Sequence, residues 1–220
     1  MIDTSALRPL CATFFATGLI TAFAMPLAAP AMAQEVDKAL EARMDKEKND
    51  RKGCKIAICD AARNKKADGA DIACTVTKTW AATDLRDSIL KGKLDWPWGH
   101  AQCTADIKIE RKMLAQALAA GTLDAKLAKQ TVNCTLDQKG GSEKYSISFG
   151  LTPTVTFSGG KATKATLNWS DIQGSALAKG AVWSAATLDN NVGLFEGTTV
   201  DQINSFFGPK CDEVKEELGK

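Results

Sequence analysis

The stretch Lys144-Tyr-Ser-Ile-Ser-Phe-Gly-Leu151 alternates polar and apolar side chains along its whole length. Its apolar positions fall at every second residue: Tyr145, Ile147, Phe149 and Leu151. Side chains on a β-strand point alternately to the two sides of a sheet, so this spacing predicts a strand with one buried and one solvated side. Such half-buried strands are typical of an antiparallel sheet that is covered on one face only.

Segments on both sides of this stretch complete the predicted fold. Further short strands are predicted at 71–80, 102–110, 131–138, 153–158 and 162–169. Helices with apolar residues three or four positions apart are predicted at 84–91, 111–120, 175–188 and 198–207. Residues 53–69 are predicted to form a loop. The sequence therefore predicts an α+β fold: an antiparallel sheet of about five or six strands, with helices mainly on one face and disulfides stapling the structure.

Residues 1–33 have the layout of a secretory signal peptide. A single cation, Arg8, precedes an apolar stretch, and the small residues Ala31-Met-Ala33 form a cleavage site. Two prolines interrupt the end of the apolar stretch, which argues against an uncleaved membrane anchor. We therefore expect an exported bacterial protein, periplasmic or secreted.

Residues 34–220 are predicted to form one domain without a transmembrane segment. This domain opens with a charged helix at 34–52, whose narrow apolar stripe would dock only lightly. The chain has a formal net charge of +2, and removing the leader removes one charge of each sign. A balance so close to neutral gives no electrostatic reason to expect a nucleic-acid partner.

Six cysteines remain once the leader is removed: Cys54, Cys59, Cys74, Cys103, Cys134 and Cys211. In an exported chain an even number predicts disulfides, here three, and fifteen pairings are possible. Three of the cysteines begin Cys-Thr segments in predicted strands, where they share the apolar side. If each bridge joined one of these to a cysteine outside the strands, six pairings would remain. Among them we expect Cys134 to pair with Cys211.

Catalytic and cofactor motifs are weak in this sequence. The single histidine, His100, and the absence of close cysteine pairs argue against a zinc site. There is no Gly-x-Ser-x-Gly motif, and the run at 159–163 is better explained as a hairpin turn than as a phosphate-binding loop. We therefore expect no enzyme activity, no cofactor and no metal.

One segment is unusual, because it concentrates aromatic residues in a turn. The candidate binding loop consists of Trp96, Pro97, Trp98 and His100. If exposed, its tryptophans would anchor a partner, since tryptophan offers a large contact area at low entropic cost. If buried, they would close one end of the core. The second interpretation is favoured, because large aromatic side chains usually contribute to cores.

Three functions remain open on this basis. The first is a non-catalytic exported binding or accessory protein that contacts another protein in the cell envelope. The second is a carrier of an apolar ligand such as a lipid, held between the sheet and the helices that contain Trp183, Phe206 and Phe207. The third is an envelope hydrolase that uses His100 and Asp95. The absence of a catalytic motif favours the first.

Overall fold

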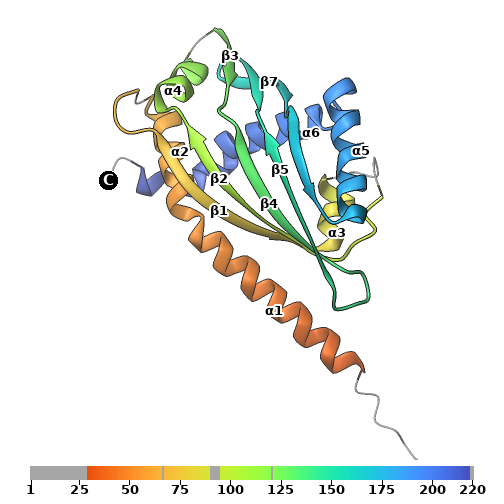
Figure 1. Ribbon diagram of the computed structural model, residues 1–220. Coiled ribbons are helices and arrows are strands. Elements are labelled where there is room, and N and C mark those ends of the chain that lie inside the picture. The colour runs from red at the N-terminus through yellow and green to blue at the C-terminus, as the bar shows by residue number, and fades with distance from the viewer. Residues whose placement is uncertain (1–28, 66, 90–94, 120, 219–220) are drawn as a thin grey trace, which may run out of the picture.

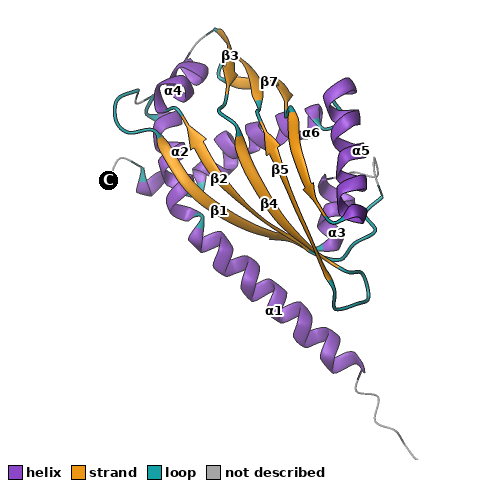
Figure 2. Ribbon diagram, viewed as in Figure 1, coloured by secondary structure: helices purple, strands orange, loops and turns teal. Residues whose placement is uncertain are grey.

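The computed structural model describes residues 29–65, 67–89, 95–119 and 121–218 (Figure 1). Most of the predicted signal peptide, at 1–28, lies outside these residues. Among the helices of the described part, none has the length and hydropathy needed to cross a membrane. The architecture is α+β, as predicted, with two antiparallel sheets and helices packed against them (Figure 2).

The larger sheet, sheet A, has five strands in the order β1-β2-β4-β5-β8. Its strands are β1 (Ile72–Trp80), β2 (Ala101–Ile109), β4 (Gln130–Asp137), β5 (Lys144–Leu151) and β8 (Trp169–Gly174). All neighbouring pairs are antiparallel, and a register shift interrupts the pairing of β5 with β8. The alternation in 144–151 thus correctly predicts a strand of an antiparallel sheet.

The smaller sheet, sheet B, has three strands in the order β3-β6-β7. They are β3 (Thr122–Lys126), β6 (Thr154–Ser158) and β7 (Lys161–Thr166). Gly159 and Gly160 both have positive φ, as the predicted hairpin between β6 and β7 requires. The sequence did not predict β3 or β8, and it placed β6 and β7 in the same sheet as β4 and β5.

The main helices are α1 (Ala29–Asp50), α2 (Lys52–Arg63), α4 (Arg111–Ala119), α5 (Ala176–Val192) and α6 (Glu196–Ser205). Shorter helical segments are α3 (Ala82–Asp84), η1 (Leu85–Ile89), η2 (Phe206–Lys210) and η3 (Lys215–Glu217). In Figure 1, α1 projects from the body of the molecule, and α6 runs behind sheet A.

The loop predicted at 53–69 is wrong over most of its length, because α2 occupies 52–63. Its buried residues, Ile58, Cys59, Ala61 and Ala62, lie at helical spacing and form one side of the helix. Of these, Ile58, Ala61 and Ala62 pack against Ile72 of β1 and Leu114 of α4. A buried apolar side therefore stabilises α2, although the sequence around it is rich in charge.

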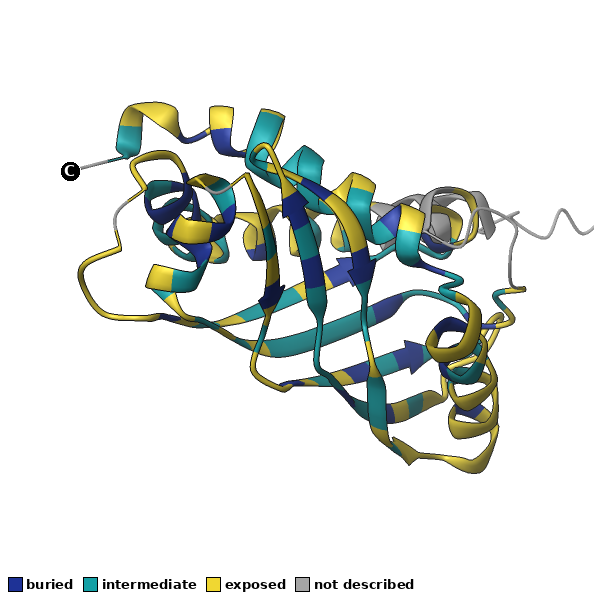
Figure 3. Ribbon diagram, turned by 90° about the horizontal axis from the view of Figure 1, so that it is seen from above, coloured by how far each residue is buried: buried dark blue, intermediate teal, exposed yellow. Residues whose placement is uncertain are grey.

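Sheet A has two faces of different chemistry. On the covered face, Ala101, Cys134, Leu136 and Ile147 form a core with Leu85, Trp98 and Ala178. Alternation places the polar residues of the same strands on the opposite face, which we call the open face. Figure 3 shows buried stretches of strand beneath the helices, and exposed residues on the outer sides of the helices.

The disulfides join Cys54 to Cys74, Cys59 to Cys211, and Cys103 to Cys134. The expected pairing of Cys134 with Cys211 is wrong. Cys103 and Cys134 are direct partners in the register of β2 and β4, so two strand cysteines bond to each other. Cys59 and Cys211 are both fully buried and link α2 to the C-terminal segment. Only the Cys54–Cys74 bridge joins a strand to a residue outside the sheet.

Candidate binding surface

The open face carries cross-strand rows of hydroxyl and amide side chains. The register aligns one row across all five strands: Thr77, Thr104, Asn133, Ser148 and Gln173. The adjacent row crosses four strands: Thr79, Gln102, Thr135 and Ser146. Each of these groups can take part in hydrogen bonds, and none is charged.

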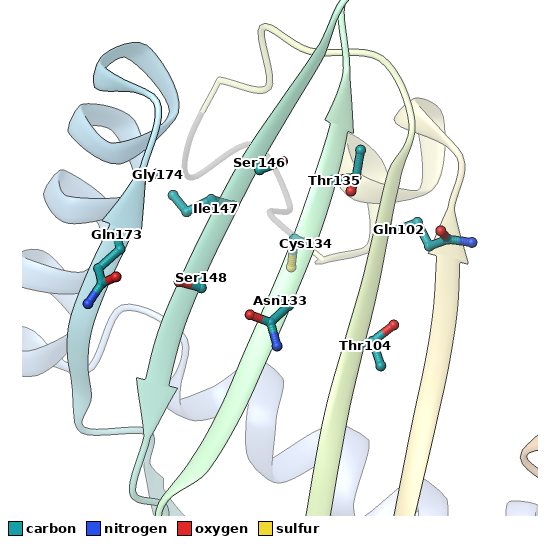
Figure 4. A pocket seen from close by; sticks show the side chains of 10 residues that line it. All are labelled: Gln102, Thr104, Asn133, Cys134, Thr135, Ser146, Ile147, Ser148, Gln173 and Gly174. Carbon is teal, nitrogen blue, oxygen red and sulfur yellow. The ribbon is translucent and has the colours of Figure 1, made fainter.

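Seven of these side chains line a hollow of about 440 Å³ on the open face (Figure 4). They are Gln102, Thr104, Asn133, Thr135, Ser146, Ser148 and Gln173. The other lining residues are Cys134, Ile147 and Gly174, so none of the ten is charged. A ligand seated here would meet a rigid set of neutral donors and acceptors, positioned by three central strands and by β8.

Glu47 of α1 closes one corner of the open face, and only 6% of its surface is exposed. Its Oε2 accepts a hydrogen bond from the backbone N–H of Thr79 at 2.6 Å. Its Oε1 accepts bonds from the Thr79 hydroxyl at 2.8 Å and from the Gln102 amide at 2.7 Å. The carboxylate therefore holds α1 against β1 and fixes the orientation of Gln102 beside the hollow.

The backbones of the edge strands also form hydrogen bonds with side chains from outside the sheet. The Arg51 guanidinium donates to the backbone carbonyl of Thr77 on β1. On β8, the Asn190 side chain accepts from the Trp169 N–H at 2.9 Å and donates to the Trp169 carbonyl at 3.1 Å. These contacts occupy backbone groups that would otherwise be available to another strand.

The predicted aromatic loop packs largely inward. Trp98 is 5% exposed and belongs to the core of the covered face. Trp96 meets it edge to face at a centroid distance of 5.0 Å, and its indole N–H donates to the Gly99 carbonyl at 2.7 Å. Pro97 is exposed. Trp98 thus contributes to the core, and the proposed binding role of the loop stays a prediction.

His100 and Asp95 were the candidates for hydrolytic chemistry. The His100 Nδ1 accepts a hydrogen bond from the Ala82 backbone N–H at 3.3 Å, where α3 begins. Asp95 is exposed. Within the described ranges, no group of three or more His, Cys, Asp or Glu side chains is arranged to hold a metal ion.

The open-face residues are not among the site residues predicted from the sequence. The alternation along the strands does mark these residues as polar and solvent-facing. They occupy the positions between the apolar residues that predicted the core. Only the register shows that these positions align into rows. Comparison of the chain with protein-family models, with curated proteins and with solved structures gives no match.

Proposed function

We propose that this chain is a non-catalytic, exported accessory protein of the bacterial cell envelope that binds a partner protein on the open face of sheet A. The observation that carries the proposal is the uncharged hollow, lined by seven hydroxyl and amide side chains. Three disulfides and the absence of a spanning helix among the described residues are compatible with export.

The chemistry of the hollow favours a protein surface as its occupant. Hydroxyl and amide groups can replace their water with the main-chain and side-chain groups of a partner, and they can adapt to donors or acceptors alike. An apolar ligand would remove that water without replacing its hydrogen bonds, which is unfavourable. Five strands spaced about 4.8 Å apart also give a face about 20 Å wide, broad enough for a protein contact.

The test is co-purification of the oxidised chain from its own periplasm with two matched lysine variants. Asn133 lines the hollow, whereas Thr163 is an exposed residue of β7 in sheet B, outside the open face of sheet A. Asn133→Lys should reduce the retained partner at least about tenfold, because it places a charge within the interface. Thr163→Lys should change retention less than about twofold.

Native mass spectrometry of the same samples separates the alternatives. A protein partner that depends on Asn133 but not on Thr163 supports the proposal. An apolar small-molecule adduct on the wild-type chain would instead indicate the carrier. Equal retention of the partner by both variants, or the absence of any partner, would contradict binding at the open face.

A further inference from the structure

Helix α5 carries the exposed large hydrophobic side chains of the described residues. They are Leu177 (64% exposed), Trp183 (57%), Leu188 (46%) and Val192 (72%). In Figure 1, α5 stands beside β8 at the outside of the molecule. The adjoining side of the helix holds the buried residues Ala178 and Ala186, which attach it to the body. α5 lies outside the hollow of the open face, so any binding by this helix is independent of the proposed function.

Three of the exposed hydrophobic residues fall on one stripe of the helix together with small residues. Its members are Leu177, Ala181, Ser184, Ala185, Leu188 and Val192. They lie within one side of the helix at spacings of three and four. Trp183 lies off this stripe, in a groove of about 350 Å³ shared with Trp169 and Lys179.

The positions of the stripe, though not its residue types, are symmetric about its midpoint. Leu177 and Val192, Ala181 and Leu188, and Ser184 and Ala185 are each symmetric about the midpoint between 184 and 185. Two antiparallel copies related by a two-fold axis therefore place Leu177 opposite Val192, and Ala181 opposite Leu188. Small side chains meet at the crossing, and each large leucine meets a smaller side chain. Parallel copies would set Ala181 opposite Ala181 and leave a void there.

The polar and charged groups of α5 do not oppose such a contact. The Ser184 hydroxyl already donates to the Gly180 carbonyl at 3.0 Å, so its burial breaks no bond to the protein. The two charged residues of the helix, Lys179 and Asp189, lie off the stripe. Asp189 is buried against the body, where it accepts a hydrogen bond from the Trp169 indole at 2.8 Å.

We infer that the occupant of the α5 stripe is a second copy of this chain, packed antiparallel through α5. The stripe spans sixteen residues, which makes it about 24 Å long. One helix pair of this length buries less than the roughly 800 Å² per partner of a standard stable interface. The dimer is therefore weak, with a dissociation constant in the micromolar range or above, and it forms as the concentration rises.

Sedimentation equilibrium of the oxidised full chain, from about 1 to about 500 µM, tests this dimer. Leu188→Lys and Ala181→Glu should each weaken association at least about tenfold, because each places a charge opposite an apolar residue. The double variant Ala181→Glu/Leu188→Lys should regain most of the association, since antiparallel packing sets each glutamate opposite a lysine. Trp183→Ser is the matched control, and it should leave the constant within about twofold.

The double variant also tests whether the two α5 helices pack antiparallel. In antiparallel copies the regained association should weaken as salt is added, because salt screens exposed charge pairs. Far-UV circular dichroism confirms that each variant keeps its fold. A failure of the double variant to associate would overturn antiparallel packing, and equal losses from Leu188→Lys and Trp183→Ser would overturn the assignment to the stripe.

A wild-type chain that stays monomeric at about 500 µM would overturn the inference altogether. Flotation of that monomer with vesicles of anionic and neutral phospholipid would then assign the stripe to a membrane surface. Loss of a co-purified protein on Leu188→Lys, but not on Trp183→Ser, would assign it to another protein.

Discussion

The two faces of sheet A differ sharply, although the same strands build both. On β4, Leu136 is 3% exposed and packs in the core, whereas its neighbour Thr135 points to the open face and lines the hollow. On β5, Ile147 is 3% exposed and Ser146 is exposed. The covered face therefore supplies the packing that stabilises the sheet. The open face carries polar side chains, and we propose that it serves binding.

The largest effect should come from the covered face. Leu136→Ala removes buried methyl groups and leaves a cavity, so it should lower the free energy of unfolding by about 3 kcal/mol. Thr135→Ala, the adjacent residue on the open face, should change it by about 0.5 kcal/mol or less. Urea unfolding of the two variants measures both values. Similar losses would show that the two faces contribute alike to stability.

Glu47 and Thr79 are buried at one corner of the open face. Glu47→Ala leaves the N–H and hydroxyl of Thr79 without their acceptor, and should destabilise the chain by about 2 kcal/mol. Glu41→Ala, an exposed glutamate on the same helix, is the matched control and should be nearly neutral. Urea unfolding of the two variants measures both changes in the free energy of unfolding. Equal losses would show that Glu47 contributes no more to stability than the exposed Glu41.

Asn190 secures α5 at the β8 edge of the sheet. Asn190→Asp keeps an acceptor for the Trp169 N–H but replaces the donor to the Trp169 carbonyl with an oxygen. We expect a loss of about 1 kcal/mol in thermal or urea unfolding. Asn191→Asp adds the same charge at the next, exposed position and isolates the effect of charge alone. Equal losses would mean that the two-bond contact contributes nothing.

The smallest effect concerns Glu213, an exposed carboxylate near the C-terminus. Hydrogen bonds from Lys55 and then Lys210 lower the pKa of Glu213 from 4.5 to about 2. A pKa lowered by folding means that the ionised group stabilises the native state above about pH 4.5. This contribution is lost as the pH falls from about 4.5 towards 2.

Glu213→Gln should therefore lower the thermal midpoint slightly near neutral pH, by an amount that shrinks below pH 4.5 and in high salt. Thermal melts of the wild type and the variant between pH 2 and pH 7 measure this difference. A difference that grows towards low pH would contradict the assignment.

The strands were the most predictable part of the fold, because alternation in segments such as 144–151 reports a half-buried sheet directly. Helix α2 was missed because charged residues and two cysteines resembled a loop, although Ile58, Ala61 and Ala62 kept helical spacing. The short strand β3 has only five residues and carried no comparable pattern.

The disulfides and the open face were less predictable, because both depend on register between strands. Cys103 and Cys134 are thirty-one residues apart and become neighbours only when β2 pairs with β4. Asn133 and Ser148 likewise form one row only through the pairing of β4 with β5. Sequence patterns within one strand identify the polar side, but they do not show which polar residues of different strands meet.

A single variant that truncates the four residues of one open-face row that line the hollow tests the central claim most directly. It combines Thr104→Ala, Asn133→Ala, Ser148→Ala and Gln173→Ala. Its free energy of unfolding in urea and its retention of the proposed partner are measured on the same preparation. We predict a change in stability within about 1 kcal/mol and nearly complete loss of the partner. A large loss of stability, or full retention of the partner, would contradict an open face that serves binding rather than folding.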